Sequence, residues 1–151
     1  MQRITSFSVD HDFIVPGIYV SRIDGDVTTY DLRTRKPNCG DYMDNLTMHS
    51  IEHMLATFLR NSKLKDDIIY FGPMGCQTGF YLLVRNADNK TVLATLINAL
   101  KNTESASEMF GAQRKECGNY QNLSIDAARA EAKRYRTELE SREQTFEYPT
   151  E

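Results

Sequence analysis

The sequence predicts an α+β domain in which helices pack on one face of an antiparallel sheet. The length of 151 residues suits a single domain of ordinary size. Strand-like segments come first along the chain, and strands then alternate with helices that short turns connect. Hydrophobic residues make up 40% of the chain and charged residues 26%, which excludes low-complexity disorder. We therefore expect residues 1–151 to form one catalytic domain.

The first half of the chain carries two strand patterns followed by a helix. Residues 13–22 are rich in β-branched and aromatic side chains and lead to a turn at residues 24–26. Residues 27–33 alternate in character with a period of two, which is typical of a half-exposed strand. From Thr47 to about Asn61, apolar residues recur at spacings of three and four, which predicts an amphipathic helix.

The second half predicts a hairpin and two further helices. Residues 67–71 and 80–85 are rich in Ile, Tyr, Leu and Val, so we expect two strands there. Between them, residues 72–79 contain three glycines and predict a tight turn. One helix is expected after Asp88, and another from about Ser124, where helix-favouring residues predominate.

Charge and cysteine content narrow the class of partner and the compartment. The net charge is −3, with 18 Lys and Arg against 21 Asp and Glu, so no basic excess favours nucleic acid. The longest apolar runs are far shorter than the roughly 20 residues that span a bilayer, and residues 1–10 lack the apolar stretch of a signal peptide. Three cysteines form no disulfide-framework pattern. We expect a cytoplasmic protein that binds a small molecule or a protein, with no nucleic-acid or membrane partner.

The sequence HSIEH at residues 49–53 is the strongest chemical signal in the chain. Side chains four residues apart project side by side from a helix, so His49 and His53 can share one metal ion. Glu52 lies beside them and need not be a ligand. This arrangement is the inverted form of the zincin motif. A catalytic site of this kind usually takes a third protein ligand, for which spacing leaves five candidates open: Cys117, Cys76, Glu104, Glu108 and Cys39.

Cys76 stands in the glycine-rich turn between two predicted strands. Backbone N–H groups in such a turn can stabilise a thiolate, which would suit catalysis. The alternative is a cysteine that is simply buried in the turn.

Several segments together resemble one family. They are HSIEH at 49–53, GPMGCQTGFY at 72–81, ECG at 116–118, SFSVDH at 6–11, and YDLR at 30–33 followed by Pro37-Asn38. In this order they resemble the S-ribosylhomocysteine lyase family (LuxS, the autoinducer-2 synthases). The resemblance covers about residues 4–118 and is loose over the predicted C-terminal helix and tail, residues 124–151.

This resemblance implies an activity and a set of residue roles. The implied reaction cleaves S-ribosylhomocysteine to homocysteine and 4,5-dihydroxy-2,3-pentanedione, the precursor of autoinducer-2. His49, His53 and Cys117 would hold one metal ion per subunit, Fe²⁺ natively, with Zn²⁺ or Co²⁺ able to substitute. Glu52 and Cys76 would transfer protons.

The resemblance also implies substrate contacts and a homodimer with active sites at the subunit interface. Ser6, His11 and Arg33 would contact the ribose part of the substrate. We expect this N-terminal set to reach into the partner's metal site, so that a His11 variant and a Cys76 variant complement each other in mixed dimers.

Two positions depart from the family pattern, and two other classes of function stay open. Tyr70 replaces an aspartate common in the family, which leaves one substrate contact unassigned, and Leu123 replaces a common histidine that is neither ligand nor catalyst. Cys39 has no family role. An inverted-zincin metallopeptidase would use Glu52 to activate a water molecule, but it would not need Cys76. A zinc-stabilised binding module would need a fourth protein ligand.

Overall fold

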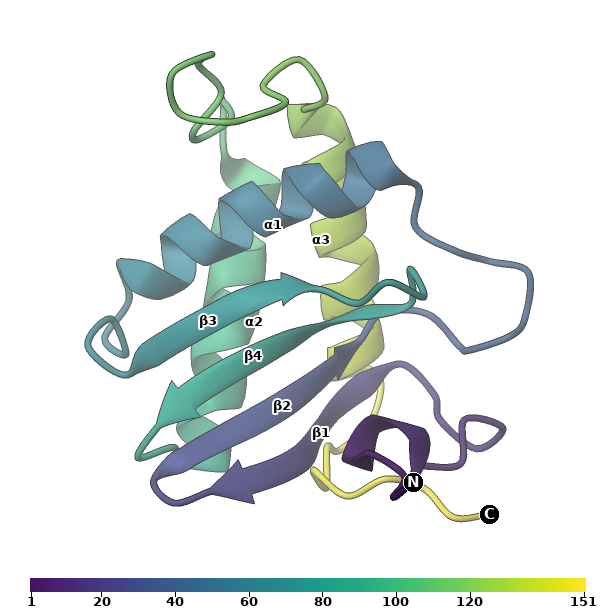
Figure 1. The fold of residues 1–151 in the computed structure, drawn as a ribbon. Helices are drawn as coiled ribbons and strands as arrows, with labels where there is room; N and C mark the ends of the chain where they lie inside the picture. The colour runs from purple at the N-terminus through teal and green to yellow at the C-terminus, as the bar shows by residue number, and fades with distance from the viewer.

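The computed structural model describes residues 1–151 and contains one antiparallel sheet with three long helices (Figure 1). The strands are β1 (Gly17–Asp24), β2 (Val27–Arg33), β3 (Ile68–Pro73) and β4 (Gly79–Arg85), in the spatial order β1-β2-β4-β3. The helices are α1 (Asn45–Arg60), α2 (Asn89–Ser105) and α3 (Ile125–Glu140), preceded by a short 3₁₀ helix, η1 (Thr5–Phe7). The predicted α+β class is confirmed, and each predicted strand and helix is present, although β1 begins at Gly17 rather than at residue 13 and runs through Asp24, where the turn was expected to begin. None of these helices is long and apolar enough to cross a membrane.

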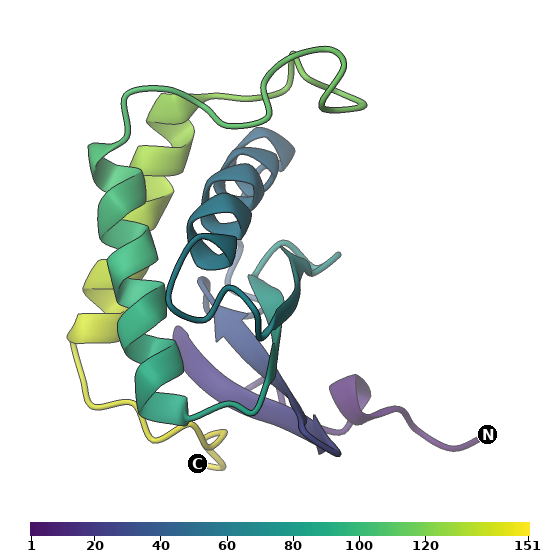
Figure 2. The same ribbon diagram turned by 90° about the vertical axis from the view of Figure 1, so that its left-hand side faces the viewer.

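The helices lie on one side of the sheet, as the side view in Figure 2 shows. Helices α2 and α3 stand next to each other, and α1 lies between their upper part and the β3 edge. Every strand contributes apolar side chains to the core beneath them, including Ile18, Tyr30, Phe71 and Leu82. Burial of this apolar surface is the main force that holds the two layers together.

Helix α1 carries the HSIEH sequence, and its ends are well defined. The Asp44 carboxylate accepts a hydrogen bond of 2.7 Å from the Thr47 backbone N–H, which satisfies one of the free donors of the first turn. On the buried side, Ile51, Met54 and Leu55 are no more than 1% exposed. This burial fixes the rotation of the helix, so His49, Glu52 and His53 project from its other, half-buried side.

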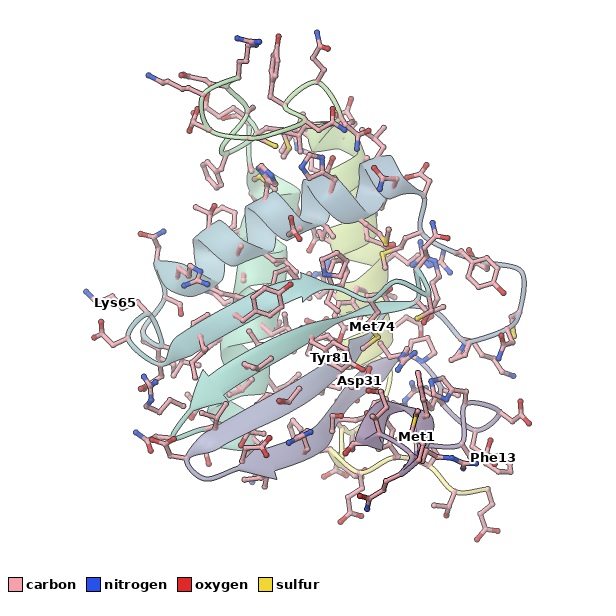
Figure 3. All side chains as sticks on the ribbon, viewed as in Figure 1. Met1, Phe13, Asp31, Lys65, Met74 and Tyr81 are labelled. Atoms are coloured by element: carbon pink, nitrogen blue, oxygen red, sulfur yellow. The ribbon has the colours of Figure 1, made fainter.

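The second strand is more buried than its alternating pattern predicts. Asp31 and Arg33 were expected on a half-exposed face, yet they are only 1% and 3% exposed. The C-terminal tail, residues 141–151 after α3, covers this face. The backbone N–H of Val20 donates to the Phe146 carbonyl at 2.8 Å, and the Tyr148 ring stacks on Tyr19. Figure 3 labels Asp31 on β2, close to Tyr81 of β4. The prediction was wrong here because the covering segment lies more than 100 residues away in the sequence.

The turn between β3 and β4 is shorter than predicted, because the strands extend to Pro73 and resume at Gly79. Gly79 is required at its position: a Cβ atom there would lie 2.5 Å from the carbonyl oxygen of Leu32 on β2. Gln77 adopts a left-handed backbone with φ of 66°. Its side chain donates to the Met43 carbonyl at 2.8 Å, and its own carbonyl accepts from the Met43 N–H at 3.0 Å. These bonds hold Cys76, one residue earlier, against the loop that leads to α1.

Candidate metal centre and active site

The two histidines of α1 point one nitrogen each toward a common space. Their ring centroids are 4.7 Å apart. The Nδ1 atom of His49 lies 2.7 Å from the Asn122 carbonyl oxygen, and that of His53 lies 2.9 Å from the Phe110 carbonyl oxygen. Because a carbonyl can only accept, each Nδ1 carries the proton and each Nε2 keeps a free lone pair. Carbonyl contacts of this kind fix the ring orientation of metal-binding histidines.

One further contact of His49 could compete with this assignment. The Asn122 side-chain nitrogen lies 3.3 Å from the same Nδ1 atom. That amide nitrogen donates one of its two protons to the Asn45 side-chain oxygen at 2.5 Å. The carbonyl contact to Nδ1, at 2.7 Å, is much shorter than the 3.3 Å contact with the amide nitrogen. The protonated Nδ1 tautomer of His49 is therefore the consistent one.

The third donor comes from the loop between α2 and α3, which passes over α1 at the top of Figure 2. The Cys117 Sγ atom lies 3.4 Å from His49 Nε2, and the ligand atoms of Cys117, His49 and His53 all lie within 4.8 Å of one another. The Asn119 backbone N–H donates a hydrogen bond to this sulfur at 3.4 Å. The structure thus brings Cys117 to the histidines.

Other candidates for the third ligand are placed elsewhere. Both carboxylate oxygens of Glu104 accept hydrogen bonds from Arg136, at 2.6 and 2.8 Å, and the Arg136 bond lowers the pKa of Glu104. Cys39 is an exposed free thiol and is not part of the group formed by His49, His53 and Cys117.

Gly111 completes the packing around His53. Its φ of +65° lies in the left-handed region, and a Cβ atom there would lie 3.0 Å from His53 Nδ1. The Phe110 ring, one residue earlier, contacts Phe58 of α1 edge to face at 5.2 Å. The loop is therefore anchored on α1 both by an apolar contact and by the carbonyl that orients His53.

The donor set suits a borderline divalent ion. Two imidazole nitrogens and a thiolate are ligands that Zn²⁺ and Fe²⁺ accept readily. Three protein ligands leave one coordination position for substrate, which is the arrangement of catalytic rather than structural sites.

Glu52 lies between two hollows beside this group. One, of about 260 Å³, is lined by His49, Pro73 and other residues. The other, of about 380 Å³, is lined by His53, Tyr70 and other residues. Glu52 lines both hollows, so its carboxylate can reach a substrate that occupies either one. Tyr70, the departure from the family pattern, therefore stands on the rim of the space that Glu52 serves.

Cys76 belongs to a different group. Its sulfur lies 2.9 Å from the hydroxyl of Thr78, which in turn accepts a 3.0 Å hydrogen bond from Arg33 Nη1. The sulfur partner is thus a side-chain hydroxyl and not the backbone N–H groups expected from the glycine-rich turn. Burial alone would lower the pKa of Arg33, but its hydrogen bonds to Asp31 and the charge of Asp31 outweigh burial and raise that pKa. The guanidinium behind Thr78 therefore stays charged.

His11 and Cys76 share a cavity of about 300 Å³ within one chain, and Asn38 and Tyr42 are among its other lining residues. His11 Nδ1 lies 2.9 Å from the Val9 carbonyl oxygen, so its Nε2 atom is the one with a free lone pair. The half-buried Ser6 lies in η1, outside the lining of this cavity.

The structure therefore sorts the predicted site residues into two groups. Glu52 and the three candidate ligands form one group, while Cys76, His11 and, through Thr78, Arg33 form the other. Cys76 lines neither of the two hollows beside Glu52. The sequence-based expectation pairs Cys76 with its own chain's metal ligands and His11 with the partner's; within one chain, the structure places Cys76 and His11 in one cavity and Glu52 in others.

Comparison with known proteins places this arrangement in a family. A family model described as S-Ribosylhomocysteinase (LuxS) matches residues 4–146. The chain belongs to the S-ribosylhomocysteinase (LuxS) family. It is similar to the S-ribosylhomocysteine lyase of Borrelia garinii subsp. bavariensis, with 41% identity over 99% of this chain and 100% of that protein. It is also similar to those of Finegoldia magna (42%, covering 89% and 90%) and Clostridium beijerinckii (40%, covering 92% of each).

Membership of the S-ribosylhomocysteinase family confirms the resemblance and gives no support to the metallopeptidase alternative. Sequence reasoning missed the groups that orient the site: the carbonyls of Phe110 and Asn122, and the hydroxyl of Thr78. Backbone carbonyls leave no trace in a sequence. Thr78, by contrast, stands two residues after Cys76 in the quoted GPMGCQTGFY block and could have been considered.

Proposed function

We propose that this chain, as one catalytic domain spanning residues 1–151, is a metal-dependent S-ribosylhomocysteine lyase. The products are L-homocysteine and 4,5-dihydroxy-2,3-pentanedione, a precursor for quorum-sensing signals. The observation that carries the proposal is the group of His49, His53 and Cys117, with Glu52 beside it, in a chain that matches curated lyases of this name over nearly its full length.

The chemistry requires proton transfers next to a carbonyl group. A thioether is a poor leaving group unless negative charge can form on the carbon beside the one that bears sulfur. The sugar carbonyl must therefore move from C1 to C2 and then to C3, each time by loss of a proton from one carbon and gain of a proton at its neighbour. Loss of the C4 proton then expels homocysteine thiolate from C5. These shifts are internal, so no redox cofactor is needed.

Glu52 and Cys76 are assigned these proton transfers. Glu52 is next to the ligand His53 in the sequence and lines two hollows beside the ligand group, so it can serve as one acid–base group. The Cys76 thiolate, which the Thr78 hydroxyl contacts, is assigned the other. Acid–base catalysis of this kind typically contributes about 10²–10⁴-fold. Ser6, His11 and Arg33 are proposed to position the ribose part of the substrate.

One metal ion per subunit is proposed at the ligand group. His49, His53 and Cys117 would hold it, and the ion would supply Lewis-acid stabilisation of negative charge on the sugar oxygens. We assign Fe²⁺, with Zn²⁺ or Co²⁺ as functional substitutes, because a thiolate and two imidazoles suit these ions better than hard, oxygen-preferring ones. A reducing cytoplasm, which we propose as the location, would keep the thiolates available.

A homodimer is proposed to bring the two groups of residues together. Within one chain, Cys76 and His11 line one cavity while Glu52 lines others, so a complete site needs a second copy. Exposed large apolar side chains occur in both groups: Tyr42 lines the cavity of Cys76 and His11, and Tyr70 lines one of the hollows beside Glu52. Such side chains on a monomer favour an interface. A two-fold interface would then form two equivalent sites from complementary halves.

Release of homocysteine from S-ribosylhomocysteine, measured as free thiol with metal-loaded protein, tests the activity directly. Mixed dimers test the shared site. Cys76→Ala and Glu52→Gln are each expected to be inactive. After subunit exchange, one site of each mixed dimer has both residues intact. With random exchange half of the dimers are mixed, so about a quarter of wild-type activity should return.

The matched control is a mixture of Cys76→Ala with His11→Ala. Both changes lie in the same half, so every site of a mixed dimer keeps one defect and no activity should return. Recovery in the control but not in the test pair would mean that Cys76 acts in the same half of the site as Glu52 and not in that of His11. Failure of both mixtures, with exchange verified by differently tagged chains, would contradict the shared site.

A further inference from the structure

The C-terminal tail is bound firmly to the outer strand of the sheet. The Gln144 side-chain oxygen accepts a 3.2 Å hydrogen bond from the Ile18 N–H, and the Phe146 carbonyl accepts one of 2.8 Å from the Val20 N–H. Between these two positions of β1, the Tyr19 ring stacks on Tyr148 with a centroid distance of 4.8 Å and an interplanar angle of 19°. The tail thus continues the sheet beyond β1 and delivers Tyr148 to the face opposite the helices.

Tyr148 binds a buried ion pair. Its hydroxyl donates a 2.7 Å hydrogen bond to Asp31 Oδ2. The same carboxylate receives two hydrogen bonds from Arg33, Nε to Oδ1 at 3.0 Å and Nη2 to Oδ2 at 2.6 Å. Burial, and then the charge of Asp31, raise the pKa of Tyr148 far above its usual range, so the phenol stays protonated and acts as a donor. The carboxylate is therefore held from both sides.

The remaining Arg33 nitrogen carries the connection to Cys76. Its Nη1 donates to the Thr78 hydroxyl oxygen at 3.0 Å, and the same oxygen lies 2.9 Å from the Cys76 sulfur. A hydroxyl has one proton. Arg33 donates to a lone pair of the Thr78 oxygen, so the hydroxyl proton is free to point at the sulfur. If the sulfur is a thiolate it has no proton of its own, and the Thr78 hydroxyl must then be the donor in this contact. The side chains of Asp31, Arg33 and Thr78 thus connect Tyr148 to the proposed catalytic thiol by hydrogen bonds.

We propose that Tyr148 is a positioning residue for Cys76, and that it acts through Asp31, Arg33 and Thr78 to keep the Thr78 hydroxyl aimed at the Cys76 sulfur. The inference rests on the proposed function, since it assigns Cys76 to proton transfer. Tyr148 lies two residues beyond the part of the chain that the family model matches, and it lines a separate cavity of about 350 Å³ rather than the Cys76 cavity. Tyr148 therefore lies outside the cavity of Cys76, and the hydrogen-bonded side chains of Asp31, Arg33 and Thr78 connect the two residues.

The test compares two tyrosines that form one stack. Tyr148→Phe removes the hydroxyl that binds Asp31. Tyr19→Phe is the matched control, because it removes a hydroxyl of the same stack that binds only the Val15 carbonyl, at 2.7 Å. The readout is the rate of iodoacetamide alkylation of Cys76 at pH 7 in the metal-loaded protein, followed by mass spectrometry of the Cys76 peptide. The exposed Cys39 serves as the internal reference in every sample.

Tyr148→Phe should slow alkylation of Cys76 about threefold, and Tyr19→Phe should leave it unchanged. Thr78→Val removes the hydroxyl that contacts the Cys76 sulfur and should slow alkylation of Cys76 about tenfold, as expected for loss of one hydrogen bond to a charged group. Thr78→Ser keeps the hydroxyl and should restore a rate close to wild type. Equal rates for Tyr148→Phe and wild type would overturn the proposal. Equal slowing by both tyrosine variants would also overturn it, because packing of the tail would then explain the effect.

Steady-state kinetics provide a second readout. Tyr148→Phe should lower kcat of homocysteine release about threefold, because its hydroxyl acts on the Cys76 sulfur through Asp31, Arg33 and Thr78. A rise in KM with kcat unchanged would contradict the positioning role. Alkylation does not require turnover. If Cys76→Ala still released homocysteine at the wild-type rate, the proposed function of Cys76 would fail while the alkylation series still decided whether Tyr148 controls the thiol.

Discussion

Comparison of Gly111→Ala with Gly25→Ala distinguishes the effect of backbone strain from the effect of damage to the metal site. Gly111 has a φ of +65°, and a Cβ atom added there would lie 3.0 Å from Nδ1 and 3.3 Å from Cε1 of His53. Gly25, in the turn between β1 and β2, has a φ of +61° and no atom within 4 Å of the same added carbon. Gly25→Ala therefore imposes almost the same backbone strain without any contact.

The two variants should lose a similar amount of stability, but only Gly111→Ala should also lose metal affinity. A left-handed backbone costs an alanine about 1–2 kcal/mol, and the stiffer unfolded chain returns about 0.4–1 kcal/mol. The net loss of about 1 kcal/mol corresponds to a fall in Tm of about 2–4 °C for a chain of this size. In Gly111→Ala the added methyl group also presses on the His53 ring and on its bond to the Phe110 carbonyl, at 2.9 Å. Loss of such an orienting contact typically lowers metal affinity about 10–100-fold.

Thermal unfolding of the metal-free variants, followed by competition for Zn²⁺ with a chelating dye, measures both quantities. We expect similar Tm values for the two variants but weaker binding in Gly111→Ala alone. If Gly111→Ala bound Zn²⁺ as tightly as Gly25→Ala, the Phe110–Gly111 segment would not orient His53, and the argument would be refuted.

Three further predictions follow from the site and its surroundings. Metal analysis should find that Cys117→Ala is purified without metal and that Cys76→Ala retains it; a metal-free Cys76→Ala protein would contradict the division of roles. Glu52→Gln should abolish homocysteine release while circular dichroism and bound metal stay at wild-type levels, since Glu52 lies outside the ligand group. The hydrogen bond from Arg136 lowers the pKa of Glu104 below 4.5, so its contribution to stability is present above that pH and disappears as the pH falls through the lowered value. Urea unfolding should therefore show Glu104→Gln less stable than wild type at pH 7 and the difference shrinking toward pH 3; a constant difference would argue against the ion pair.

Local patterns in the sequence predicted the elements of the fold well. The spacing of Ile51, Met54 and Leu55 indicated α1, and these side chains are its buried stripe. The predicted start at Thr47 was two residues late because Asp44 caps the helix by accepting the Thr47 N–H. Such a cap can be read from a sequence, but element boundaries are generally the least certain part of such a prediction.

Features that depend on distant contacts escaped the sequence analysis. Spacing left five candidates for the third ligand, because only the folded loop between α2 and α3 brings Cys117 within 3.4 Å of His49 Nε2. The same limit applies to β2: alternation indicated an exposed face for Asp31, and the tail that covers it comes from the other end of the chain. The grouping of Cys76 with His11 likewise needed the cavity that they share.

The loop between α2 and α3 spans residues 106–124 without a helix or strand, yet it supplies a ligand and both orienting carbonyls. Its other contacts with α1 are few, chiefly the Phe110 ring against Phe58 and the Asn122 side chain bonded to Asn45. An ion bound by His49, His53 and Cys117 would therefore add a strong link between the loop and the helix. Arg114 and Lys115 are exposed in this loop, close to Cys117. Susceptibility to trypsin at these two residues thus becomes a direct reporter of metal occupancy, with cleavage suppressed in loaded protein and restored by a chelator.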